Sequence, residues 1–190
     1  MKRNLVGFSP RLTGVGVGLP IVAMILMLAL ADAAAAQNSC AGLTPGCFKG
    51  AFQGQDTHDV LPADAMSVVI RTTATGTAAH LGPFSLTREV TGSLLDFSDV
   101  GWAHWVAANG DSIDTTVVGQ AEISDLPGGW LKVTEMHTVT GGTGRFAGVQ
   151  GGFTVELYHS LAPTEISGGV ETHDIFGSFH GTIALSDKRH

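Results

Sequence analysis

A carboxylate and an imidazole stand close together in a segment that is otherwise apolar at alternate positions. Glu135 and His137 are two residues apart and flanked by Val133 and Val139, so in an extended strand both side chains project from the same face. Such a pair can move protons to and from a bound molecule. The same two groups can also hold a metal ion.

Three further polar residues interrupt apolar faces in the same way. Arg88 alternates with apolar residues in its segment, His159 does so in another, and His104 lies among aromatic neighbours. We take Arg88, His104, Glu135, His137 and His159 as candidate ligand-binding residues inside the protein. Because buried charges need partners, the structural alternative is that Glu135 pairs with Arg88 and that the histidines are hydrogen-bonded core residues.

Other chemistry finds little support. The chain has 8 histidines, but His58, His80 and His173 fall in expected loops and none of the eight forms a metal-binding spacing. We therefore predict no metal and no cofactor. The nucleophile elbow G-x-S-x-G is missing, and no catalytic residue is assigned.

The segment "GGTGRFAGVQGGFTVEL" contains "GTGRFA", which matches the loose dinucleotide-binding pattern G-x-G-x-x-[G/A]. That pattern needs a helix after the glycines to hold the pyrophosphate. The residues that follow alternate like a strand, so we interpret the segment as a sharp corner. Gly141, Gly142 and Gly144 are expected to adopt positive φ, Phe146 to fold over the end of the core, and 151–152 to form a bulge.

The elements that position these residues read as strands. Apolar residues recur with period two between turn signals, and no convincing helix follows residue 36. The expected strands are 49–57, 67–79, 83–91, 101–107, 112–123, 130–140, 152–161 and 176–185. Their even spacing predicts an all-β sandwich or closed barrel. A hairpin of the sixth and seventh strands would bring His159 near Glu135 or Val133.

The glycine corner and "GSFHGTI" resemble the corner and closing strand of the allene oxide cyclase-like barrel, which dirigent proteins share. The earlier "GTAAHLGPFSLTREVTGSLLDF" and "AANGD" are similar to bacterial secreted proteins of this type. The resemblance implies an eight-stranded antiparallel β-barrel with a mostly apolar lumen. Its members are often oligomeric, so a homo-oligomer is also expected. It implies no single activity, since fold does not fix function.

The first 36 residues have the layout of a secretory signal peptide. Basic residues precede the apolar run "LPIVAMILMLAL", and small residues with an A-x-A site follow it. The alternative is an uncleaved membrane anchor, although the run is short for a spanning helix. We expect a signal peptide over 1–36, an N-terminal segment over 37–48 and a barrel domain over 49–187, with no membrane association after cleavage.

The cysteine pair and the net charge indicate the cellular compartment and exclude one class of partner. The closely spaced Cys40 and Cys47 are expected to form a disulfide in a secreted or periplasmic protein. Loss of residues 1–36 removes three basic residues and one acidic residue, so the net charge changes from −7 to −9. Such an acidic chain repels nucleic acid, which we exclude as a partner.

Three functions stay open. The first is a lumen that binds or orients a small apolar ligand without catalysis. The second is a lumen isomerase or cyclase that uses Glu135 and a histidine. The third is a structural or surface barrel with no ligand, which a lumen filled by Phe84, Phe153, Phe179 and Leu157 would favour.

Overall fold

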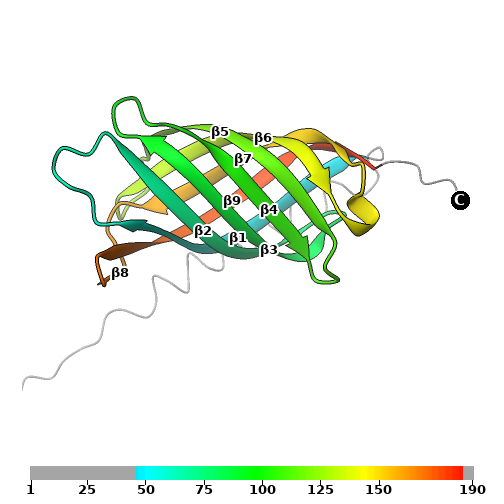
Figure 1. Cartoon of the computed structure of the whole chain (residues 1–190), viewed down its shortest axis with the longest axis horizontal. Helices are drawn as coiled ribbons and strands as arrows, with labels where there is room; N and C mark the ends of the chain where they lie inside the picture. Colours follow the sequence, from blue (N-terminus) through cyan, green and yellow to red (C-terminus); the bar gives the residue numbers. More distant parts are fainter. Residues whose placement is uncertain (1–45, 186–190) are drawn as a thin grey trace, which may run out of the picture.

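The computed structural model describes residues 46–185, which form an antiparallel sheet closed into a barrel (Figure 1). Its strands and single 3₁₀ helix are β1 (Cys47–Asp59), β2 (Ser67–Ala78), β3 (Gly82–Ser93), β4 (Ser98–Ala107), β5 (Ser112–Ile123), β6 (Trp130–Gly142), η1 (Gly144–Phe146), β7 (Gln150–Ser160), β8 (Glu165–Ser167) and β9 (Val170–Ala184).

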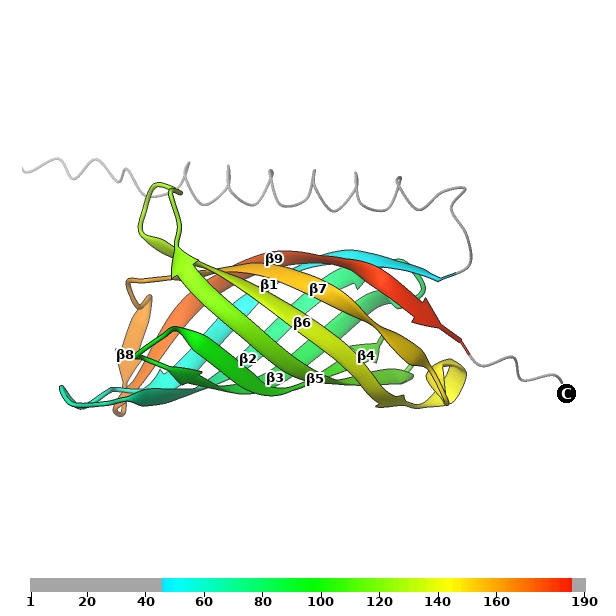
Figure 2. The same cartoon turned by 90° about the horizontal axis from the view of Figure 1, so that it is seen from above.

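Eight long strands make the wall of the barrel. Sequential neighbours pair from β1 to β7, β7 pairs with β9, and β9 pairs with β1 over Cys47–Asp59 to close the ring. The short β8 lies on the β7 side of β9, beyond the end of β7. The two orthogonal views show the strands crossing obliquely around one axis (Figures 1 and 2). The predicted eight-stranded antiparallel barrel is confirmed.

Alternation along the strands builds the core, as the period-two pattern predicted. Every second residue points inward, and one continuous apolar cluster fills the interior. The predicted inner faces are confirmed in the middle of the strands. They are wrong at three strand ends, where Ile123, Leu161 and Leu185 are exposed because the barrel wall stops covering them.

Aromatic rings fill the half of the barrel nearer the glycine corner. The Trp105 ring lies 5.0 Å from that of Phe179 and 5.4 Å from that of Phe153. Small residues in the wall make room for these rings. A Cβ atom on Gly177 would lie 2.9 Å from Cζ of Phe52, and one on Gly181 would lie 2.5 Å from Cβ of Phe153. Large and small inward residues therefore alternate, as closely packed barrels require.

The glycine segment forms a corner, as predicted, but with different geometry. Phe146 is fully buried over the end of the core, which confirms its predicted place. Gly144 has φ of 57°, whereas Gly141 and Gly142 belong to β6 and are not at positive φ. The register shift falls between Asp114 and Thr115 on the β5–β6 pair, not at 151–152.

Two strands extend further than the sequence indicated. β1 continues to Asp59 and β9 begins at Val170, so His58 and His173 lie in strands and not in loops. Both extensions are polar, and the two strands pair with each other there, with His58 opposite Glu171. Backbone pairing, and not hydrophobic alternation, continues the sheet at this end.

Several sequence predictions concern the rest of the chain. Residues 1–36 and Cys40 lie outside the described residues, so the signal peptide, the domain limits and the Cys40–Cys47 disulfide stay predictions. Within residues 46–185, no helix is long and apolar enough to span a membrane.

Candidate functional site

A chain of buried polar side chains crosses the barrel interior. Asp56, Thr72 and Arg88 are neighbours in the register of β1, β2 and β3. Arg88 Nη1 donates a hydrogen bond to Thr72 Oγ1 at 2.8 Å, and Thr72 donates to Asp56. Arg88 Nη2 lies 2.6 Å from Glu135 Oε1, which belongs to β6. The guanidinium thus bridges the walls made by β3 and β6.

Glu135 has both carboxylate oxygens engaged. His137 Nε2 lies 3.0 Å from Oε2, and Thr115 Oγ1 lies 2.9 Å from His137 Nδ1. A carboxylate only accepts, so the proton on His137 Nε2 faces Glu135, while the Thr115 hydroxyl lies within hydrogen-bond distance of both His137 Nδ1 and the Ala103 carbonyl. Burial alone would raise the pKa of Glu135, but the Arg88 charge and the His137 hydrogen bond outweigh it and lower that pKa. The carboxylate is ionised, with Arg88 beside one oxygen and His137 beside the other.

There is no room for a substrate beside Glu135. The space between Phe52, Arg88, Trp105 and Glu135 does not accommodate a water molecule. Phe84, Phe153, Phe179 and Leu157 are all buried. This is the packed centre that the structural alternative expected, including the pairing of Arg88 with Glu135, and it disfavours a ligand in the lumen.

A second polar cluster lies toward the opposite end from the glycine corner. The rings of His58, His173 and His159 stack in that order, with centroids 4.9 Å and 4.6 Å apart. His159 Nδ1 lies 3.0 Å from Asp56 Oδ2. Burial acts to raise the pKa of Asp56, but its hydrogen bond from His159 and the Arg88 charge lower it overall. Asp56 therefore connects the histidine stack to the central network.

Four of the five candidate residues lie inside the barrel, and one does not. Arg88, Glu135, His137 and His159 are buried. His104 is on the outer wall, where Nδ1 lies 2.6 Å from Asp114 Oδ1 and both side chains are partly exposed. Its place in the lumen was wrong, because Trp105 takes the inward position of that strand.

The predicted position of His159 along its hairpin also needs correction. His159 is opposite Leu131, and Glu135 is opposite Val155, so the two polar residues are separated along the strands. β6 continues to Gly142 and β7 begins at Gln150, so the two strands pair two residues out of the register that the expected limits 130–140 and 152–161 imply. His159 contacts Asp56 of β1 instead of Glu135.

Asp99 is a functional candidate that sequence reasoning missed. It is buried opposite Gly119, which in turn is opposite Glu135. Burial, and then the Glu135 charge, raise its pKa to about 7, and Oδ1 has no hydrogen-bond partner among the described residues. The fourth strand was expected over 101–107, but β4 begins at Ser98, so Asp99 lies in the strand and not in the turn before it. Asp56 and Thr72 were also missed, although each occupies an inward position that alternates with outward ones along its strand.

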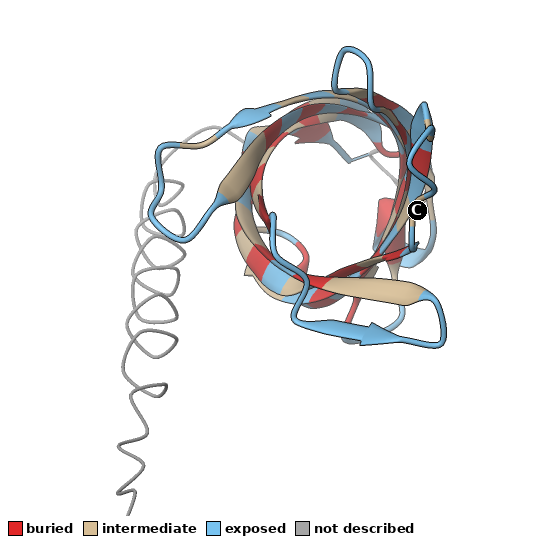
Figure 3. Ribbon diagram, turned by 90° about the vertical axis from the view of Figure 1, so that its left-hand side faces the viewer, coloured by how far each residue is buried: buried red, intermediate tan, exposed pale blue. Residues whose placement is uncertain are grey.

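The loops at one end of the barrel carry exposed apolar side chains. We define the four-loop end by loops 60–66, 94–97, 124–129 and 161–169, onto which Figure 3 looks. Nine of the fifteen exposed large apolar residues within 46–185 lie in or directly beside these loops: Val60, Met66, Leu94, Leu95, Phe97, Ile123, Leu126, Leu161 and Ile166. We call these nine residues the apolar rim.

Phe97 is the most unusual member of the apolar rim. Its φ is 58°, a conformation that is rare and strained for a bulky side chain, yet 48% of the residue is exposed. Its carbonyl accepts a hydrogen bond from Ala121 N, and its own N–H donates to Ser93 O. The backbone is thus held in a conformation that presents an aromatic ring to solvent.

Two shallow depressions lie on the outer wall, away from the buried network. They have volumes of about 670 and 750 Å³ and share Gln53, Thr75 and Ser85. The larger one is bounded by Trp130 and Phe176, whose rings are 5.1 Å apart. None of the five predicted site residues lines either depression.

Comparison with known proteins gives a likeness to solved structures and no family. No protein-family model and no curated protein matches the chain. A solved structure of the pterocarpan synthase dirigent protein GePTS1 is similar over 78% of this chain and 96% of its own, with 10% identity and a TM-score of 0.42. A likeness this weak carries no argument about activity.

Proposed function

We propose that the protein is a secreted or periplasmic barrel that binds or orients a small apolar molecule without catalysis, at its four-loop end. The observation that carries the proposal is the apolar rim. The nine residues are spread over four connections at one end of the barrel, and a concentration of exposed apolar side chains of this kind favours a binding site there. The loops at the opposite end, 79–81, 108–111 and 143–149, expose no large apolar side chain.

The buried network supports binding over catalysis. A general acid or base must reach the proton that it transfers. Glu135 is held by Arg88 and His137 in a space too small for water, so it is poorly placed to act as the general acid or base of an isomerase or cyclase. The network instead connects β1, β2, β3, β6 and β7, which makes a rigid support for the loops.

Strain at Phe97 supports a role for the rim itself. A left-handed backbone costs on the order of 1–3 kcal/mol for a residue of this kind and persists where the surroundings impose it. A glycine would adopt this φ without cost. The ring of Phe97 is therefore the side chain most directly worth testing.

The test measures binding of the neutral fluorescent probe N-phenyl-1-naphthylamine. The variants Leu95→Ser and Phe97→Gly remove apolar surface from the rim. Val118→Ser and Met136→Ser are matched controls, since both residues are exposed apolar positions on the outer wall. Phe176→Ala reports on the larger outer depression.

We expect saturable binding by the unaltered protein and a loss of about tenfold in affinity for each rim variant, which corresponds to ~1.4 kcal/mol of lost apolar contact. The controls should bind as the unaltered protein does. Unchanged affinity in both rim variants refutes the proposed binding site at the four-loop end. A loss confined to Phe176→Ala would place the probe in the outer depression and overturn the proposal.

A further inference from the structure

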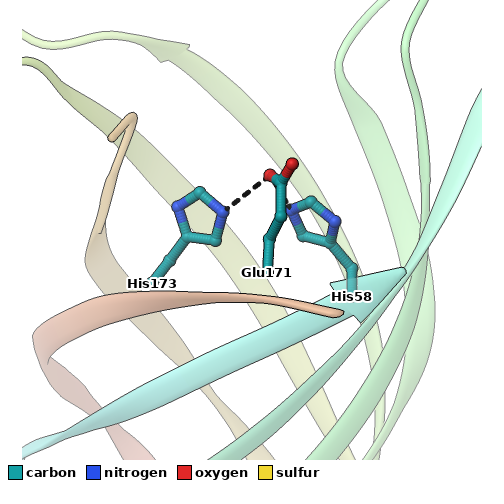
Figure 4. Close-up of side chains that lie close together, drawn as sticks. All are labelled: His58, Glu171 and His173. Carbon is teal, nitrogen blue, oxygen red and sulfur yellow. Dashed lines mark ion pairs between the residues drawn. The ribbon is translucent and has the colours of Figure 1, made fainter. Parts of the chain in front are cut away.

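Two histidines and one carboxylate meet on the inner wall at the four-loop end (Figure 4). His58 of β1 and Glu171 of β9 are opposite each other in the strand register, and His173 follows two residues after Glu171 on the same face. Glu171 Oε2 lies 3.4 Å from His173 Nε2 and 3.9 Å from His58 Nε2. The three ligand atoms all lie within 4.8 Å of one another.

The backbone fixes the tautomer of both imidazoles. His173 Nδ1 lies 2.7 Å from the carbonyl of Ser160, and His58 Nδ1 lies 2.9 Å from the carbonyl of Asp59. A carbonyl only accepts, so each Nδ1 carries the proton and each neutral ring keeps its lone pair on Nε2. Metal-binding histidines have this arrangement, in which a backbone carbonyl orients the ring and selects the ligating nitrogen.

His173 Nε2 is a buried polar atom with no hydrogen-bond partner in the part of the chain that the structure describes. Only 3% of the residue is exposed. Two imidazole lone pairs directed at a carboxylate make an electron-rich site that suits a cation.

We propose that His58, Glu171 and His173 form a binding site for a divalent transition metal ion of the Zn²⁺ class. The site goes beyond the proposed ligand function and does not depend on it. Two imidazole nitrogens and one carboxylate oxygen are the ligands of a catalytic-type zinc centre, which keeps one position for water or another ligand. The same set also suits other divalent first-row ions.

The distances fit such an ion after small side-chain movements. Metal–ligand bonds of about 2.0–2.2 Å in a tetrahedron put ligand atoms roughly 3.3–3.6 Å apart. Glu171 Oε2 and His173 Nε2 already have this separation, and His58 Nε2 must move inward by less than about 1.5 Å from the 4.8 Å limit to reach it. Glu171 is 23% exposed, which provides a path from solvent.

The stack around His173 supports the site from behind. His173 is sandwiched between His58 and His159, and His159 is hydrogen-bonded to Asp56. These contacts hold the central ring in one orientation before any ion arrives. A preoriented ring loses little side-chain entropy when it binds.

The experiment uses tag-free, chelator-treated protein and isothermal titration with Zn²⁺, with Co²⁺ as a spectroscopic probe of coordination. Glu171→Gln removes the carboxylate ligand and keeps the side-chain size, and its partial exposure makes it tolerable to the fold. His173→Asn removes the central ring. His104→Ala and His180→Ala are matched controls, because both histidines lie on the outer wall.

We expect one Zn²⁺ per chain, a tetrahedral Co²⁺ spectrum, and at least a tenfold loss of affinity in Glu171→Gln with an unchanged metal-free melting temperature. The outer-wall variants should bind normally. Absence of saturable binding by the unaltered protein would overturn the proposal. So would unchanged affinity in Glu171→Gln, or an equal loss in His104→Ala and His180→Ala, since either result would show adventitious binding to surface histidines.

Discussion

The central ion pair allows a quantitative test of how the barrel interior is stabilised. Replacing Arg88 by Met removes the only described guanidinium within salt-bridge distance of Glu135 and Asp56, at 2.6 and 3.7 Å. Both carboxylates are buried, so the change leaves two negative charges without their cation. Removing one partner from a buried ion pair costs about 3–5 kcal/mol of unfolding free energy. For a domain of this size, that corresponds to a melting temperature lower by roughly 6–20 °C.

A double replacement separates charge from packing. In Arg88→Met/Glu135→Gln, the glutamine still contacts His137, and Asp56 keeps its hydrogen bond to His159. We expect this variant to recover most of the loss and to lie within about 2 kcal/mol of the unaltered protein. Arg71→Met is the control, because its pair with Glu89 is 3.1 Å long but 57% and 41% exposed and is worth at most ~1 kcal/mol.

The assay is urea denaturation followed by tryptophan fluorescence, since Trp105 is buried beside the network. The pH dependence gives a second reading. In the unaltered protein, the lowered pKa of Glu135 means that its contribution is present above its unfolded pKa and is lost as pH falls through the folded one. In Arg88→Met the unpaired carboxylates prefer to be protonated, so stability should rise toward acid pH. A cost below ~1 kcal/mol, or equal costs in the single and double variants, would refute this reasoning.

Three further predictions follow from other features. Burial raises the pKa of Asp99 to about 7, so the stability of the folded protein falls as pH rises from the unfolded pKa of this carboxyl through 7. Asp99→Asn should therefore melt at a higher temperature than the unaltered protein only toward the upper part of that pH range. Gly181→Ala places a Cβ atom 2.4 Å from the Cα of Phe153 and should lower the urea midpoint markedly, whereas Gly110→Ala meets no atom within 4 Å and should cost only the strain of its φ of 86°. If Cys40 and Cys47 are bonded, the intact mass of the secreted protein should rise by the two thiol hydrogens on reduction, and an unchanged mass would contradict the predicted disulfide.

The local alternation of apolar and polar residues was sufficient to predict most strands of the barrel. Strands such as Ser112–Ile123 and Trp130–Gly142 alternate clearly and end at turn residues, so their limits and inner faces could be predicted to within a few residues. The inward positions of Glu135 and His137 follow from the same pattern. The fold prediction therefore depended on residues whose side chains sort cleanly between core and solvent.

The second polar cluster could not be found in this way. His58 and His173 occur in polar segments with no hydrophobic period, and they lie in strands only because β1 and β9 pair there. The first and last strands are far apart in sequence, so no local signal shows that His58 lies opposite Glu171. At the glycine corner the difficulty is different, because the glycine-rich sequence does not show which residues belong to the strands, and the position of His159 was therefore wrong.

The pairing of β1 with β9 has a consequence for how the chain reaches its folded state. Residues near Cys47 meet residues near Thr182, so the contact that closes the ring joins the two ends of the described sequence. Such a high contact order slows folding. Before β9 joins, β1 and β7 each present an unpaired edge, and open edges of this kind recruit other chains. A chain stopped short of β9 is therefore an aggregation-prone open sheet, and the last strand decides whether the molecules stay separate.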